Sequence, residues 1–184
     1  MEIRASTRLL AVLGDPVGHS LSPAMFNAAI AALGLDAAYL ALRVPAADLG
    51  TVLAALAAVG GGGNVTIPHK EAVERSLARK TDLCARAGSC NTFWTEREGL
   101  VGDNTDVAGV RAGLAALGVA DASRWLVLGT GGTARAVAVA AADARAALVV
   151  RSREAHRAAT FVEWARSAGA TATPAHRGDR VDVV

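Results

Sequence analysis

The stretch WLVLGTGGTARAV, residues 125–137, decides the fold class of this chain. A short apolar run ends at Gly129, and an alanine-rich run of helical composition follows Gly131. Gly129, Gly131 and Ala134 satisfy the pattern G-x-G-x-x-G/A, in which glycines allow a tight turn and let backbone approach a pyrophosphate at the helix N-terminus. A strand before the pattern and a helix after it are the context that a dinucleotide site requires. We therefore predict that a dinucleotide binds at Gly129, Gly131, Gly132, Thr133 and Ala134.

The end of the next predicted strand indicates which dinucleotide binds. A site that selects NAD carries an acidic residue about 20 residues further on, which holds the ribose 2′-hydroxyl. This chain has VVRSR at 149–153, with Arg151 and Ser152 at the strand end. Because a guanidinium pairs with phosphate oxygens, we predict NADP as the cofactor. The alternatives are a solvated strand end and a site that uses NAD.

Outward from this stretch, short β-rich runs alternate with alanine-rich helical runs, a pattern typical of an α/β fold with mainly parallel strands. Before residue 120 we predict strands at 8–14, 37–44 and 64–67, a hairpin at 90–104, and helices at 22–34, 45–60, 71–79 and 106–117. Ser22 is expected to cap the helix at 22–34, with Pro23 at its first position. After residue 123 we predict strands at 125–129, 146–151, 170–174 and 181–184, and helices at 131–144 and 153–169.

Two domains follow from this pattern. We predict an N-terminal α/β substrate domain at 1–104 and a Rossmann-type NADP-binding domain at 105–184, with the boundary in the region 104–123.

Composition and charge exclude several classes of protein. Nineteen basic and 17 acidic residues give a net charge of +2, and the arginines are scattered, so no nucleic-acid partner is expected. No apolar run reaches the roughly 18 residues of a membrane span. The N-terminus does not resemble a signal peptide, so we expect a cytoplasmic protein whose mature form begins here. The spacing of Cys84 and Cys90 and the dispersed histidines predict partly buried, reduced thiols and no metal site.

Polar residues gather where predicted elements end. NVTIPHK, residues 64–70, carries Asn64, Thr66 and Lys70, CNT adds Asn91, and GDNTD, residues 102–106, ends on Asp106. Open α/β sheets place their ligand crevice at such ends.

Lys70 suits one type of chemistry. Hydride transfer to a ketone needs a cation or acid beside the oxygen, and the only other lysine is Lys80. A nearby aspartate would keep Lys70 protonated. Taken singly, a solvated lysine and a helix-capping NTD remain alternatives.

Five ordered motifs give the chain a resemblance to the shikimate dehydrogenase family, from about residue 10 to its end. They are GDPVGHSLSPAMFNAAI at 14–30, NVTIPHK at 64–70, AGSCNT at 87–92, GDNTD at 102–106 and GTGGTARA at 129–136.

The resemblance implies a reaction and a set of roles. The reaction is the reversible NADPH-dependent reduction of 3-dehydroshikimate to shikimate. The hydroxyls of Ser20 and Ser22 would bind the carboxylate of shikimate, and the ring hydroxyls would be bound by Asn64, Thr66, Asn91 and Asp106. Lys70 and Asp106 would form the catalytic pair, and which of the two moves the proton stays open.

The chain departs from the family pattern at three places. Phe26 replaces a histidine, Val150 replaces an asparagine of the 2′-phosphate segment, and the sequence stops at DRVDVV where family members continue. We therefore expect an incomplete dinucleotide-binding domain, a fragment of a longer chain, and weak or no turnover if this is the whole natural product.

Three other functions compete with this one. One is that of a paralogue that prefers quinate or an aminated shikimate analogue, and another is that of a catalytically silent ligand-binding protein. A hydrolase using Ser20 and His19 is disfavoured because the G-x-S-x-G elbow is absent. The alanine-rich helices are compatible with a monomer or a homodimer.

Overall fold

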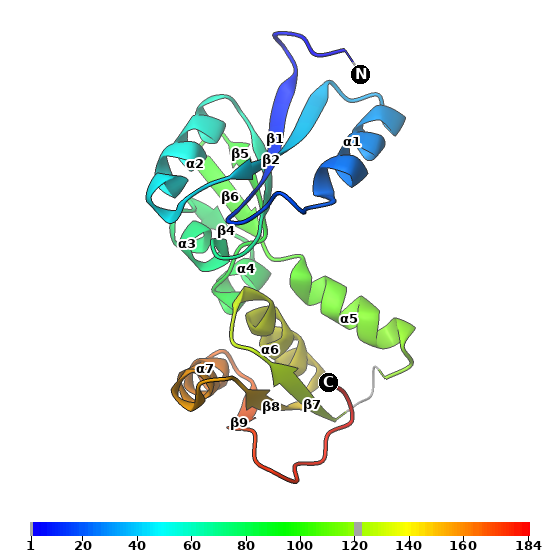
Figure 1. The fold of residues 1–184 in the computed structure, drawn as a ribbon, viewed down its shortest axis with the longest axis vertical. Helices are drawn as coiled ribbons and strands as arrows, with labels where there is room; N and C mark the ends of the chain where they lie inside the picture. The colour runs from blue at the N-terminus through cyan, green and yellow to red at the C-terminus, as the bar shows by residue number, and fades with distance from the viewer. Residues whose placement is uncertain (1, 120–122) are drawn as a thin grey trace. The chain divides into compact units, whose positions relative to one another are not determined.

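Figure 1 shows the computed structural model of the chain, which describes residues 2–119 and 123–184. These residues form two compact units. The first holds the residues up to Thr81 together with Cys90–Asp103, and the second holds Asp82–Ser89 and the residues from Asn104 onward. Part of the predicted boundary region, 120–122, lies outside the described residues. The single predicted division after residue 104 was wrong for residues 82–89, since Leu83 and Ala87 belong to the core of the second unit.

The first unit is built on a mixed six-stranded sheet with the strand order β2-β1-β3-β5-β6-β4. The strands are β1 (Arg8–Gly14), β2 (Ala37–Arg43), β3 (Gly62–Val65), β4 (Arg79–Lys80), β5 (Thr92–Glu96) and β6 (Gly99–Asp103). β1 runs parallel to β2 and β3, while β5 runs antiparallel to β3 and β6. The helices are α1 (Ser22–Ala32), η1 (Ala46–Asp48, a 3₁₀ turn), α2 (Leu49–Ala58) and α3 (Lys70–Arg75).

The second unit has a parallel sheet with the order β7-β8-β9. Its strands are β7 (Arg124–Leu128), β8 (Ala147–Arg151) and β9 (Thr171–Pro174). Its helices are α4 (Asp82–Ala87), α5 (Asp106–Ala116), α6 (Gly132–Ala144) and α7 (Ala155–Ser167). The β7-α6-β8-α7-β9 run (Figure 1) is the alternation that the sequence predicts, and the α/β prediction is confirmed.

Small and apolar side chains fill both cores. In the first unit, Val12, Ile30 and Tyr39 pack between α1 and the β1–β2 pair, with Phe26 stacked on the Tyr39 ring at 4.5 Å between centroids. In the second unit, one whole face of α6 is alanine and valine, and Ala138–Ala141 are fully buried. Alanine side chains let α6 lie close to its neighbours, which explains the unusual alanine content of this helix.

Several predicted elements differ from those observed. The helix predicted at 71–79 ends at Arg75, because residues 79–80 pair with β6 instead. The short helix α4 was not predicted. The strand predicted at 64–67 lies at Gly62–Val65, and the strand predicted at 181–184 is a single bridge between Val183 and Trp125.

The start of α1 also differs from the prediction. Ser22 is the first helical residue, Leu21 holds the cap position, and no side chain caps the helix. Cys84 and Cys90 are free thiols, and both are fully buried, whereas the sequence predicts partial burial.

Candidate functional site

The predicted substrate-binding residues of the first unit lie at one edge of its sheet. β1 ends at Gly14 and β3 ends at Val65, and these two strands are parallel. β5 is antiparallel to β3, with Thr92 opposite Asn64, so β5 begins where β3 ends. Residues that follow β1 and β3 or precede β5 therefore share this edge.

Ser20 and Ser22 stand side by side at the start of α1. The Ser22 backbone N–H donates to the Ser20 hydroxyl oxygen at 3.2 Å, which leaves the Ser20 hydroxyl proton for another acceptor. Within the described residues, the Ser22 hydroxyl has no hydrogen-bonding partner. Two hydroxyl donors at a helix N-terminus favour an anion such as a carboxylate.

Thr66 is held at the same edge by backbone contacts. Its N–H donates to the Leu13 carbonyl at 2.8 Å, and its carbonyl accepts from the His69 N–H at 3.0 Å. A side chain at Gly14 would overlap the Thr66 methyl group, so the glycine allows this close approach. Thr66 therefore lies directly beside the end of β1.

Lys70 is the first residue of α3 and is half-buried. Its backbone carbonyl accepts from the Cys90 N–H at 2.8 Å, which ties this turn to the residue before Asn91. His69 is only 2% exposed, and its Nε2 lies 2.6 Å from the Val44 carbonyl. Because a carbonyl only accepts, Nε2 carries the proton and donates, and the buried imidazole fixes the turn from which Lys70 projects. Sequence reasoning missed this role of His69.

Asn64 and Asn91 are brought together by hydrogen bonds. The Asn64 Nδ2 group donates to the Asn91 carbonyl at 3.3 Å and to the Thr92 hydroxyl oxygen at 3.1 Å. The Tyr39 hydroxyl donates to Asn64 Oδ1 at 2.6 Å, and burial raises the pKa of Tyr39 to about 12. Tyr39 and Thr92 therefore belong to the site, although sequence reasoning named neither.

Asp106 belongs to the second unit, where it is the first residue of α5. Its N–H donates to Asn104 Oδ1 at 3.1 Å, and Asn104 Nδ2 donates to the Ser89 carbonyl and hydroxyl oxygens, both at 2.8 Å. Asn104 is fully buried. This amide fixes the start of α5.

The glycine-rich loop of the second unit joins β7 to α6. Gly129 has φ +114°, a conformation that favours glycine, and its N–H donates to the Arg151 carbonyl at 2.8 Å. Gly131 precedes α6, which begins at Gly132 without a side-chain cap. The first N–H groups of α6 are therefore available to an anion, as a dinucleotide pyrophosphate requires.

Arg151 lies beside this loop, opposite Leu128 in the β7–β8 ladder. Its side chain is exposed and Ser152 is half-buried, whereas Val150 is fully buried in the core. A pocket of about 300 Å³ begins at Thr130 of the loop and runs along α7, lined by Arg135, His156, Arg157, Thr160, Phe161 and Trp164. The Arg135 guanidinium lies 4.2 Å above the Trp164 ring. These groups give the surface beside the loop a cationic lining.

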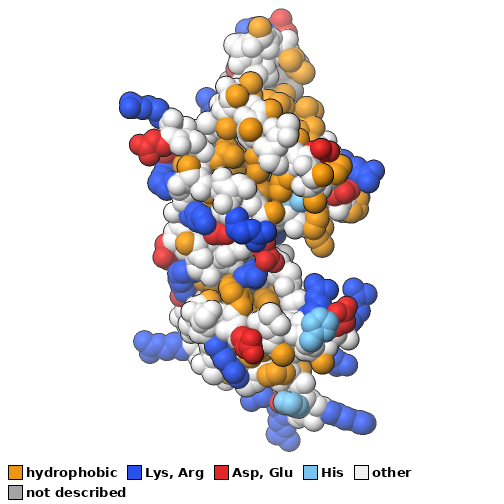
Figure 2. All heavy atoms as spheres, turned by 90° about the vertical axis from the view of Figure 1, so that its left-hand side faces the viewer, with side chains coloured by type: hydrophobic (Ala, Val, Ile, Leu, Met, Phe, Trp, Pro, Cys, Tyr) orange, Lys and Arg blue, Asp and Glu red, His pale blue; other side chains and the backbone are white. Residues whose placement is uncertain are grey.

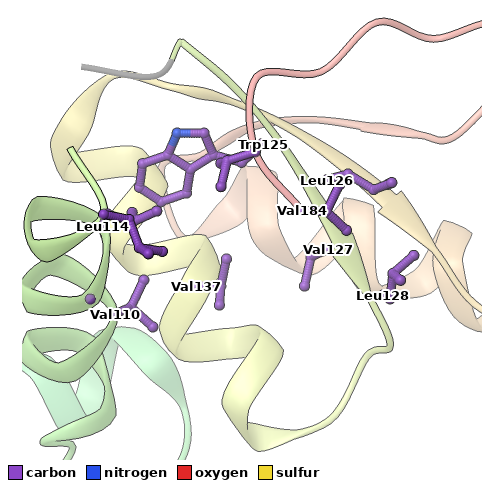
Figure 3. A pocket seen from close by; sticks show the side chains of 11 residues that line it. Val110, Leu114, Trp125, Leu126, Val127, Leu128, Val137 and Val184 are labelled. Atoms are coloured by element: carbon purple, nitrogen blue, oxygen red, sulfur yellow. The ribbon is translucent and has the colours of Figure 1, made fainter. Parts of the chain in front are cut away.

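A larger apolar pocket of about 520 Å³ holds none of the predicted site residues. Figure 3 shows Val110 and Leu114 of α5 and Val137 of α6 facing Trp125 and other side chains of β7. Its lining offers no charged group for a nucleotide or a carboxylate.

In Figure 2, lysines and arginines are dispersed over the face in view and interspersed with acidic side chains. Over residues 2–119 and 123–184, no group of three or more metal-ligating side chains occurs. None of the described helices is long and apolar enough to cross a membrane.

Comparisons with known proteins agree with this geometry. A family model described as the shikimate dehydrogenase substrate binding domain matches residues 12–93. The shikimate dehydrogenase (NADP(+)) of Moorella thermoacetica is 44% identical over 180 residues, which cover 96% of this chain and 61% of that protein.

Solved structures of proteins with two different names share this fold. The shikimate 5-dehydrogenase of Thermus thermophilus in complex with shikimate has a TM-score of 0.80 and 34% identity, covering 96% of this chain and 72% of that one. The 5-ketofructose reductase of Gluconobacter sp. strain CHM43 has a TM-score of 0.78 and 30% identity, covering 91% and 62%.

The chain spans between about half and three fifths of the length of most of the curated relatives that it matches. The similarity to the Moorella protein extends through both units of this chain.

Proposed function

The chain belongs to the shikimate dehydrogenase family, and we propose that it performs the NADP-dependent, reversible reduction of 3-dehydroshikimate to shikimate. One observation carries the proposal: paired serine hydroxyls, two amides and a lysine share one sheet edge of the first unit. Such an edge offers donors to a carboxylate, ring hydroxyls and a ketone oxygen of one small molecule.

On the substrate side, each residue has a distinct task. The Ser20 and Ser22 hydroxyls donate to the carboxylate, while Thr66 and Asn91 contact the ring hydroxyls. Asn64 supports Asn91 through its hydrogen bonds to the Asn91 carbonyl and to Thr92. The half-buried Lys70 ammonium stabilises the negative charge that develops on the C3 oxygen and donates a proton to it. For Asp106, the first residue of α5, the family resemblance implies that its carboxylate accepts a hydrogen bond from the neighbouring ring hydroxyl.

The cofactor fits the residues of the second unit. Gly129 has the glycine-only conformation of the loop, and the position that would hold an acid in an NAD site is Arg151. Bound NADPH supplies the hydride that reduces the ketone carbon. We assign the pyrophosphate to the loop at Gly129–Ala134 and the 2′-phosphate to Arg151 and Ser152.

The exposed Arg151 provides a test of nucleotide preference. Arg151→Glu is expected to raise the Kd for NADP about 10- to 100-fold, because a charge-assisted pair with the phosphate is replaced by repulsion. The Kd for NAD should change little or fall, since a carboxylate accepts from the ribose hydroxyl. Calorimetric titration with each nucleotide measures both constants.

Arg153→Ala is the matched control, because Arg153 is also exposed and does not line the pocket beside the loop. It should change the ratio of the two constants by less than about twofold. If Arg151→Glu weakened both nucleotides equally, Arg151 would have no part in selectivity.

The remaining predictions from sequence are a cytoplasmic location and a monomer or homodimer. A preference for quinate or an aminated analogue is separated from this proposal by comparing these compounds with shikimate as substrates.

A further inference from the structure

A continuous chain of hydrogen bonds crosses the first unit beneath its candidate substrate-binding edge. It runs from Tyr39 on β2 to Asn64 on β3, then to Thr92 on β5 and Asn91 beside it. The three distances are 2.6, 3.1 and 3.1 Å. Each of the four residues is buried or half-buried, so little water competes for these bonds.

The backbone determines the direction of this chain. Asn64 faces the Asn91 carbonyl at 3.3 Å, and a carbonyl only accepts, so the NH₂ end of the Asn64 amide must point that way. Its oxygen then points to Tyr39, which makes the phenol the donor. The phenol stays protonated at neutral pH, because burial raises the pKa of Tyr39 to about 12.

The same polarity continues to Asn91. The Thr92 hydroxyl oxygen accepts from Asn64, and the Thr92 proton is donated to Asn91 Oδ1 at 3.1 Å. The Asn91 amide oxygen therefore faces Thr92, and its NH₂ group lies on the other side of the amide. Asn91 is 9% exposed, and the residue before it is tied to the Lys70 turn.

We propose that Tyr39 is a positioning residue: its hydroxyl holds the Asn64 amide in the orientation that the Asn91 carbonyl also requires, and so supports the chain through which Asn91 meets the ligand as a donor. The consequence for Asn64 differs from the role that sequence reasoning assigned to it. Its NH₂ group bonds the Asn91 carbonyl and Thr92, so Asn64 acts on the ligand chiefly through Asn91. The proposal rests on the proposed function only for the identity of the ligand.

The ring of Tyr39 and its hydroxyl are separable. The ring stacks on Phe26, and the Tyr39 backbone N–H and carbonyl both bond the Asn27 side chain at 2.9 Å. Tyr39→Phe keeps these contacts and removes the donor alone. The Asn27 side chain therefore detects any disturbance of the Tyr39 backbone, whereas the Asn91 side chain detects a change in the hydrogen-bond chain that begins at Tyr39.

The first experiment needs no ligand. In nuclear magnetic resonance spectra of the protein, Tyr39→Phe is expected to shift the side-chain amide signals of Asn64 and Asn91 and to leave that of Asn27 in place. With Thr92→Val, which removes the hydroxyl link, Tyr39→Phe should no longer shift the Asn91 signal. An unmoved Asn91 signal, or an equal shift at Asn27, would overturn the proposal.

The second experiment measures the Kd for shikimate by titration. Tyr39→Phe and Thr92→Val should each weaken binding about 3- to 10-fold, and the double variant should bind no more weakly than the weaker of the two. Thr92→Ser, which keeps the hydroxyl, should restore most of the affinity that Thr92→Val loses. The Kd for NADP should not change. Additive losses would overturn the proposal. If the native chain bound no shikimate, the proposed function would fail, and the spectra would still decide the role of Tyr39.

Discussion

Lys70→Met is expected to lower kcat for NADP-linked oxidation of shikimate by about 10²- to 10⁴-fold, with little change in the KM for shikimate. Methionine keeps an unbranched side chain of similar length at the start of α3 but carries no charge and no proton. The loss falls on kcat because the ammonium acts on charge that develops in the transition state. Steady-state kinetics in both directions measure the effect.

Lys80→Met is the control, because Lys80 is the other lysine of the chain. Lys80 forms an ion pair with Glu74 at 2.5 Å, on the two-residue strand β4. Its loss should leave kcat within about twofold, as expected for a surface pair. A Lys70→Met enzyme with the native kcat would show that another group handles the C3 oxygen.

Gly63→Ala is expected to lower the free energy of unfolding by more than about 4 kcal/mol. Gly63 has φ +150° in β3, and a Cβ there would overlap the Ala11 carbonyl oxygen and lie 2.7 Å from the Ala11 nitrogen. These atoms are backbone of β1, the strand beside β3, so no side chain can move aside. Urea denaturation followed by circular dichroism measures the change.

Gly50→Ala is the matched control, since a Cβ at this exposed position of α2 meets nothing within 4 Å. Alanine is the better helix former, so this variant should be unchanged or more stable by up to about 1 kcal/mol. Equal urea midpoints for the two variants would contradict the packing described for β3.

Long periodic elements could be predicted from sequence, and short ones that depend on distant pairing could not. The strand at 8–14 and the helices at 106–116 and 132–144 carry their own signals of apolar runs and glycine boundaries. The residues of β3 were misplaced because Gly62 and Gly63 have low strand propensity. Glycine is needed at these two positions because β1 lies close to Gly63 and β5 lies close to Gly62.

The candidate site shows the same limit. Asn64, Thr66, Lys70 and Asn91 could be named because polar residues at element ends are visible in a sequence, whereas Ser20 was named through the family resemblance. Tyr39 and His69 could not, since each acts through one hydrogen bond to a residue 25 positions away. At position 150, valine replaces the asparagine of the family pattern. The Val150 side chain is fully buried, which explains an apolar residue there and cannot be read from the sequence.

The most direct test of the proposed function is the absorbance of reduced nicotinamide when the protein is mixed with shikimate and NADP. Enzyme at a concentration comparable to that of the nucleotide makes even slow turnover visible. We predict a rise that requires both compounds, is much smaller with NAD and disappears in Lys70→Met. Saturable binding of NADP and shikimate without any rise would contradict the proposed dehydrogenase and indicate a silent binding protein.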